Sequence, residues 1–208
     1  MTATPLDNLD TLRERAGFLT VGETIALFER GVLAFDPFSI LIGRDVEFAG
    51  ACRIEPGVVL EARNGGHLRI GVDAAFGMGT KVQAYGGRIS VGGGAEIGLD
   101  RGFVVRADGR GTEIAIGEQS RILGGGALFG ASRIGRGAQI LGAIEANGIS
   151  LADGESYRGA DPDSRGGVLK GAGVARGLSV GRGEVVSAFG DFALAPKRRQ
   201  AEFHRRPS

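Results

Sequence analysis

The chain is poor in several residue types that build reactive or cross-linked sites. Cys52 is its only cysteine, which excludes an internal disulfide and a cysteine metal cluster. His67 and His204 are its only histidines, so few side chains could serve as a base near neutral pH. No stretch approaches the roughly 18 consecutive apolar residues that a membrane-spanning helix needs, and we expect no membrane segment.

The charges are nearly balanced, with 25 lysines and arginines against 24 aspartates and glutamates. This balance gives no overall electrostatic attraction to nucleic acid or to an anionic membrane, and we expect neither as a partner. Residues 1–10 have neither a basic start nor an apolar run. We therefore expect no secretory signal and a cytoplasmic protein.

What the chain does have is glycine, at 39 of 208 residues, and a regular six-residue spacing of large apolar side chains. The spaced residues are Ile42, Phe48, Ile54, Leu60, then Ile70, Phe76, Val82, then Val91, Ile97, Phe103, then Ile116, Ile122, Leu128, Ile134 and Ile140. Neither an amphipathic helix nor an alternating strand gives this period. A backbone that makes one short strand and one turn every six residues does, and three such units close a triangular coil of a parallel β-helix. The regular spacing also argues against glycine-rich disorder.

The spacing is interrupted in three places. The step that follows Leu60 is four residues too long, the step after Val82 is three too long, and the step after Phe103 is seven too long. Three apolar positions separate one interruption from the next, which is one full coil. The inserted loops must therefore fall at the same corner of three successive coils, and we call this row of loops the insertion ridge.

Stacking the coils in this register predicts three interior columns. The first holds Phe48, Ile70, Val91, Ile116 and Ile134. The second holds Ile54, Phe76, Ile97, Ile122 and Ile140. The third holds Ile42, Leu60, Val82, Phe103, Leu128 and Ala146. One phenylalanine per column, each on a different coil, suits a narrow core. Cys52 lies in the first coil, where we expect a small buried residue rather than a nucleophile.

Four segments follow from this organisation. They are a helical N-terminal cap at 1–36, the parallel β-helix at 37–152, an irregular lobe at 153–195 whose strands pack back on the stack, and a basic tail at 196–208. Thr4-Pro5 and the capping box from Thr20 to Glu23 begin the two cap helices. Such helices would cover the open end of the first coil. The tail is interpreted either as a solvated segment or as a phosphate-binding arm.

The Ile-Gly pairs that begin at Ile42, Ile70, Ile116 and Ile134 resemble the repeats of the hexapeptide-repeat proteins. That resemblance implies an all-β fold, a left-handed parallel β-helix, here of about five coils. It also implies a homotrimer. Many proteins of this kind are acyl-CoA-dependent O- or N-acyltransferases with active sites between subunits, and others are γ-class carbonic anhydrases.

The carbonic anhydrase activity is excluded because those relatives hold zinc with three histidines gathered across a subunit interface, and the repeat body here has one. The acyltransferases use a histidine as general base. His67 shares its register with Arg88 and Glu113, and three unrelated polar residues in one column are typical of an outward-facing surface. His67 is therefore either a surface residue or a tunable base.

Any site is expected on the insertion ridge, since loops on a rigid stack commonly carry binding groups. Among the polar residues of the ridge, the candidates for catalytic roles are His67 and Asp108, and the candidates for contacts to acyl-CoA are Arg63, Arg110, Tyr85 and Asn64. The alternative is that these are hydrophilic turn residues, with Arg88 and Glu113 paired across coils. We expect no metal and no tightly bound cofactor, with acyl-CoA as a co-substrate.

Two functional hypotheses remain at this point. The first is transfer of an acyl group from acyl-CoA to the hydroxyl or amine of a small-molecule acceptor, in a cleft between subunits. The second is a non-catalytic trimeric scaffold or a small-molecule-binding module. The aligned insertions favour the first hypothesis, and the lack of a clear loop histidine favours the second.

Overall fold

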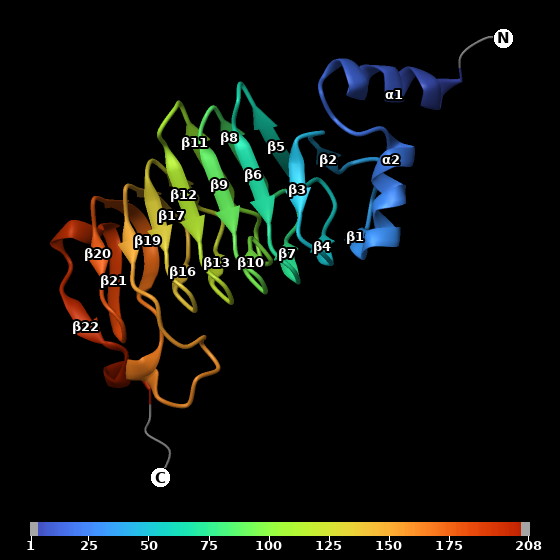
Figure 1. Cartoon of the computed structure of the whole chain (residues 1–208). Helices are drawn as coiled ribbons and strands as arrows, with labels where there is room; N and C mark the ends of the chain where they lie inside the picture. Colours follow the sequence, from blue (N-terminus) through green and yellow to red (C-terminus); the bar gives the residue numbers. More distant parts are fainter. Residues whose placement is uncertain (1–3, 205–208) are drawn as a thin grey trace.

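The computed structural model describes residues 4–204 and is a parallel β-helix with three faces (Figure 1). The first face contains β1 (Val32–Ala34), β4 (Cys52–Ile54), β7 (Ala74–Phe76), β10 (Glu96–Ile97), β13 (Arg121–Leu123) and β16 (Gln139–Leu141). The second contains β2 (Leu41–Ile42), β5 (Val59–Arg63), β8 (Lys81–Tyr85), β11 (Val104–Asp108), β14 (Ala127–Phe129) and β17 (Ile144–Asn147). The third contains β3 (Val46–Phe48), β6 (His67–Ile70), β9 (Arg88–Val91), β12 (Glu113–Ile116), β15 (Ser132–Ile134), β18 (Ser150–Leu151) and β20 (Ser179–Val180).

The predicted interior columns are confirmed with one correction. Parallel pairing aligns Phe48 with Ile70 on the third face and Ile54 with Phe76 on the first face, and each alignment continues along its column. On the second face, however, Val82 pairs with Val105 and not with Phe103. The step from the inward-facing Ile97 to the next inward-facing residue is two residues longer than the six-residue repeat. Side chains alternate along β11, so Val105 points into the core in place of Phe103.

Phe103 is nevertheless buried, because it lies at the corner just before β11 begins. Its carbonyl accepts a hydrogen bond from Lys81 N, so Phe103 is level with Thr80 of the previous coil. Only 2% of Phe103 is exposed. The prediction of one phenylalanine in each column is therefore wrong for the third column.

The insertion ridge is confirmed as the corner between the second and third faces. It consists of the turns between β5 and β6, between β8 and β9, and between β11 and β12, which rise side by side in Figure 1. Before these turns β5, β8 and β11 each have five residues, against two or three in the first-face strands β1 to β16, so the insertions extend the sheets as well as the loops.

The strands beyond Leu151 continue the stack instead of packing back on it. β19 (Val168–Arg176) pairs with both β16 and β17, which joins the first and second faces into one sheet. Gly171 and Gly173 let it cross the corner, with φ of 128° and 136°, values that a side chain would strain. β21 (Glu184–Asp191) pairs with β19 in parallel, and β22 (Lys197–Arg199) pairs antiparallel with β21.

Short 3-10 segments complete the C-terminal part, and they are η2 (Pro162–Ser164), η3 (Phe192–Leu194) and η4 (Gln200–Phe203). The predicted basic tail is thus partly strand and partly 3-10 helix. Its last two arginines, Arg205 and Arg206, lie outside the described residues.

At the N-terminus, α1 (Pro5–Arg15) begins at the predicted Thr4-Pro5 cap, which the structure completes as a capping box with Asp7. α2 (Val21–Ala26) begins with the predicted capping box from Thr20 to Glu23, and η1 (Leu27–Arg30) follows. Polar contacts, more than leucine burial, attach α1 to the stack. Leu12 is 63% exposed, whereas the buried guanidinium of Arg13 donates to the carbonyls of Phe38 and Ile40, at 3.1 and 2.7 Å. None of the helices within residues 4–204 is long and apolar enough to cross a membrane.

Cys52 occupies a column of small side chains on the first face, as expected. Its neighbour in the next coil is Ala74, and further along the same column are Ala95, Ser120 and Ala138. Burial raises the pKa of the Cys52 thiol to about 12, so the thiol is not a nucleophile at neutral pH. Ser120 is fully buried, and its hydroxyl has no hydrogen-bond partner in the part of the chain that the structure describes.

We expect Ser120→Ala to raise the free energy of unfolding by between zero and about 1 kcal/mol, because the substitution removes a buried hydroxyl that has no hydrogen-bond partner. Ala95 and Ala138 already occupy equivalent positions, so the smaller side chain fits the column. The measurement is the free energy of unfolding in urea. Ala95→Ser is the reciprocal variant and should destabilise the protein; a Ser120→Ala variant less stable by more than about 1 kcal/mol would contradict this account.

Candidate functional site

Six polar residues form two parallel rows along the insertion ridge. On the second face Arg63, Tyr85 and Asp108 follow one another in register. On the third face His67, Arg88 and Glu113 do the same, as the sequence predicted. The strands fix both rows, because the middle residues Tyr85 and Arg88 are each paired in parallel with a row member on both sides.

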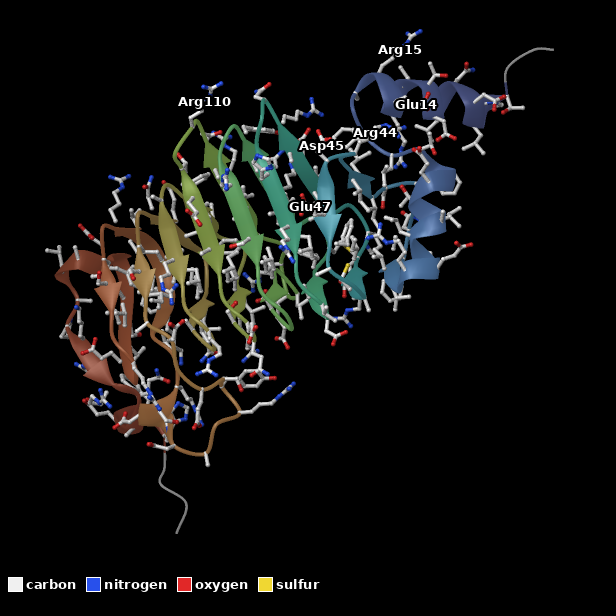
Figure 2. All side chains as sticks on the ribbon, viewed as in Figure 1. Glu14, Arg15, Arg44, Asp45, Glu47 and Arg110 are labelled. Carbon is white, nitrogen blue, oxygen red and sulfur yellow. The ribbon has the colours of Figure 1, made fainter. Side chains whose placement is uncertain are left out.

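A shallow hollow lies on the third-face side of the ridge. Its lining consists of Gly65, His67, Gly86, Arg88, Arg110, Gly111, Thr112 and Glu113. Arg110 stands at the tip of the last turn and projects away from the stack (Figure 2). The hollow thus joins one imidazole, two guanidinium groups and one carboxylate, and it is open to a ligand from outside the stack.

The hollow has little internal hydrogen bonding. Within residues 4–204, the imidazole of His67 makes no hydrogen bond or ion pair, and Arg88 and Glu113 do not form the ion pair that their shared register suggested. Asn64 occupies the first turn with a φ of 54°, a backbone position that asparagine tolerates better than most residues. These side chains are exposed, and their charges are not fixed by neighbours of the same chain.

The second-face row is built differently, around a buried carboxylate that the sequence analysis missed. Glu61 is only 4% exposed although it points outward from β5. It pairs with the guanidinium of Arg63. Its Oε2 accepts hydrogen bonds from Tyr85 Oη at 2.6 Å and from Gln83 Nε2 at 3.0 Å. The carboxylate is therefore satisfied on both oxygens.

The link between the two cap helices covers this cluster. Arg63 Nη2 donates to the carbonyl of Ala16 at 2.8 Å, and its guanidinium carbon lies 5.1 Å from the ring centre of Phe18. Strand alternation predicts that Glu61 is solvent-exposed. It is enclosed instead by the side chains of Arg63, Gln83 and Tyr85, and residues 16–18 return over the second face to hold Arg63 in this cluster. The sequence does contain a signal for this cluster. In the predicted register Glu61, Gln83 and Arg106 align on three successive coils, where their side chains can pair with one another.

Asp108 is also engaged on the second face. Its carboxylate accepts from Arg106 Nε at 2.8 Å, and its carbonyl accepts from Thr112 Oγ1 at 2.6 Å. The ridge therefore brings His67 and Arg110 together in the hollow. It keeps Arg63, Tyr85 and Asp108 in the neighbouring row, where each already has partners within the chain.

Burial raises the pKa of Tyr85, and its hydrogen bond to Glu61 raises it further, although Arg63 and Arg106 act in the opposite direction. A phenol whose pKa is raised on folding contributes its full stabilisation below about pH 10, where the unfolded phenol begins to ionise. That contribution is lost as the pH rises through the raised pKa of the folded state.

We expect Tyr85→Phe to lower the free energy of unfolding at pH 7 by about 1.5 kcal/mol, because Glu61 loses a hydrogen bond to a charged group. The variant should also lose part of the alkaline destabilisation that the unmodified protein shows above about pH 10. Urea unfolding between neutral and alkaline pH measures both effects. Tyr157→Phe is the matched control and should lose as much free energy of unfolding at alkaline pH as the unmodified protein does. If Tyr85→Phe had the same dependence of stability on pH as the unmodified protein, the role of the phenol would be contradicted.

No protein-family model matches the sequence, and no curated protein matches it. Among solved structures, the chain is similar to a hexapeptide transferase family protein from Anaplasma phagocytophilum, with 18% identity, a TM-score of 0.42, and coverage of 83% of this chain and 85% of that chain. It is also similar to a mutant GDP-perosamine N-acetyl transferase from Caulobacter crescentus, solved with CoA and GDP-perosamine. That likeness has 14% identity, a TM-score of 0.29, and coverage of 91% of this chain and 73% of that chain. These scores are low, and the assignment of a hexapeptide-repeat parallel β-helix rests on the strand pairing of the chain itself.

Proposed function

We propose that the protein transfers an acyl group from acyl-CoA to the hydroxyl or amine of a small acceptor, at the insertion ridge. The observation that carries the proposal is the open hollow in which His67 lies with Arg88, Arg110 and Glu113. An imidazole without an internal partner is available to a substrate. Two guanidinium groups beside it favour an anionic co-substrate such as acyl-CoA.

In the proposed reaction, His67 accepts the proton of the acceptor hydroxyl or amine as that group attacks the thioester carbonyl. The new carbon–oxygen or carbon–nitrogen bond forms, and the carbon–sulfur bond then breaks. The departing thiolate takes up a proton equivalent to the one that His67 removed, so the protein ends in its starting state.

Phosphate contacts are proposed at Arg110, which stands at the tip of the ridge. Arg63 and Tyr85 hold Glu61, and a phosphate role for either would compete with that cluster. The contacts of Arg63, Tyr85 and Asn64 to acyl-CoA remain predictions. The catalytic role of Asp108 also remains a prediction. His67 is exposed on a single chain, and a base is more effective where water is excluded. This supports a second copy of the chain as part of the site, and a homotrimer is the assembly that we propose from the resemblance.

We expect acetyl-CoA to raise the melting temperature of the protein, because a ligand that binds only the folded state stabilises it. Arg110→Gln should reduce this shift. Arg101→Gln removes an exposed arginine from another corner and should leave the shift unchanged. The absence of any shift at about 1 mM acetyl-CoA would contradict a co-substrate site.

The chemical role of His67 has a separate readout. His67→Gln should lower the rate of CoA thiol release in the presence of hydroxyl and amine acceptors by about a hundredfold, the scale of general base catalysis. It should leave the melting shift with acetyl-CoA unchanged. A variant that releases thiol as fast as the unmodified protein would show that His67 is not the base.

The oligomeric state gives an independent check. Light scattering should give a solution mass of three times the 21.5 kDa chain mass. A mass of 21.5 kDa would contradict the proposed site between subunits.

The alternative is a non-catalytic scaffold or small-molecule-binding module. One observation favours it: within residues 4–204, no carboxylate is hydrogen-bonded to His67, so nothing in the single chain orients the imidazole. The thiol-release measurement separates the two functions, because a binding module would give a melting shift without turnover.

A further inference from the structure

A second hollow lies on the outer side of the first face, away from the insertion ridge. It has a volume of about 320 Å³, within the range of small-molecule sites. Its residues are Arg121, Gln139, Leu141, Tyr157, Arg165, Val168, Lys170, Val185, Ser187, Gln200, Phe203 and His204. Nothing in the proposed acyl transfer uses this hollow.

The floor of the hollow is an apolar strip on the outside of the stack. Val168 of β19 pairs with Val185 of β21, and both point outward although they are only 5% and 6% exposed. Two segments cover them, the loop between β18 and β19 and the η4 segment, which contributes Phe203. Gln200 fastens η4 by donating to the carbonyls of Gly166 and Glu184, at 2.8 and 3.2 Å.

The rim of the hollow is basic. Arg165 donates from Nε and Nη2 to the carbonyl of Gly159, which leaves Nη1 directed toward His204 Nε2 at 3.4 Å. Lys170 is exposed on β19 and makes no ion pair within residues 4–204. Arg121 is balanced by Glu96 at 3.1 Å and lies 4.0 Å from the ring centre of Tyr157. No carboxylate is among the lining residues, so the hollow has an excess of positive charge.

A polar side chain also faces the hollow. Gln139 is only 6% exposed, and its side chain forms no hydrogen bond with any other of residues 4–204. Its amide is not fully buried, since Ser120 Oγ is the one fully buried side-chain oxygen or nitrogen without a partner in the described residues. The amide can therefore exchange water in the hollow for a ligand.

We propose that this hollow binds a phosphate monoester whose organic part is apolar or aromatic. Two uncompensated cationic groups, Arg165 and Lys170, match a head group that carries nearly two negative charges. The guanidinium of Arg165 and the amide of Gln139 can donate to phosphate oxygens. The floor of Val168 and Val185 and the rings at the rim match the apolar body of such a ligand.

The test uses naphthyl phosphate as the probe with the full chain, followed by fluorescence anisotropy. The chain has no tryptophan, so the naphthyl emission is measured without tryptophan background. We expect saturable binding that weakens as salt is added. Naphthol, which lacks the phosphate, should bind at least about tenfold more weakly, and so should inorganic phosphate, which lacks the ring.

Lys170→Gln and Gln139→Leu should each raise the dissociation constant for naphthyl phosphate by about fivefold or more. Lys81→Gln is the matched control, since Lys81 is an exposed strand lysine on the second face, and it should change nothing. Melting curves verify that each variant is folded. The proposal is overturned if naphthyl phosphate does not bind at about 5 mM, if neither variant weakens it, or if naphthoate binds as tightly as the phosphate.

Discussion

The structure depends on the continuous burial of apolar side chains in columns that run along each of its three faces. A single coil has too little surface to bury, and it gains stability only when the next coil covers its columns and completes its hydrogen bonds. Because the columns are continuous, each strand is held in register by two neighbours. This rigidity is what allows outward-facing side chains to stand in fixed rows, and the two hollows described above are built on such rows.

Much of the fold follows from local periodicity, and the sequence predicts it for that reason. The first and second columns, the ridge at one corner and the starts of the two cap helices depend on spacing along the chain, which is visible in the residues themselves. The error at Phe103 arose because a corner turn can lengthen by two residues without disturbing the alternation on either side. The last coils were missed because glycines in β19 replace the corner turn, so the six-residue spacing ends while the stack continues.

The site was less predictable, because it depends on which segments cover which face. The register of His67 with Arg88 and Glu113 could be read from the sequence. The enclosure of Glu61 could not, since it involves side chains from two coils and a contact of Arg63 to the chain at Ala16, 47 residues earlier in the sequence. The basic hollow of the first face combines strands with a segment after residue 199, and no short-range pattern relates them.

The three turns of the insertion ridge differ in length and in sequence, yet the columns beneath them stay in register. A change in one of these turns is absorbed where it occurs, since the strands on both sides are already fixed by the coils above and below. Residues can therefore be inserted, deleted or substituted at this corner without changing the register of the strands on either side. It is the part of the molecule where the chemistry of the surface can evolve independently of the stability of the stack.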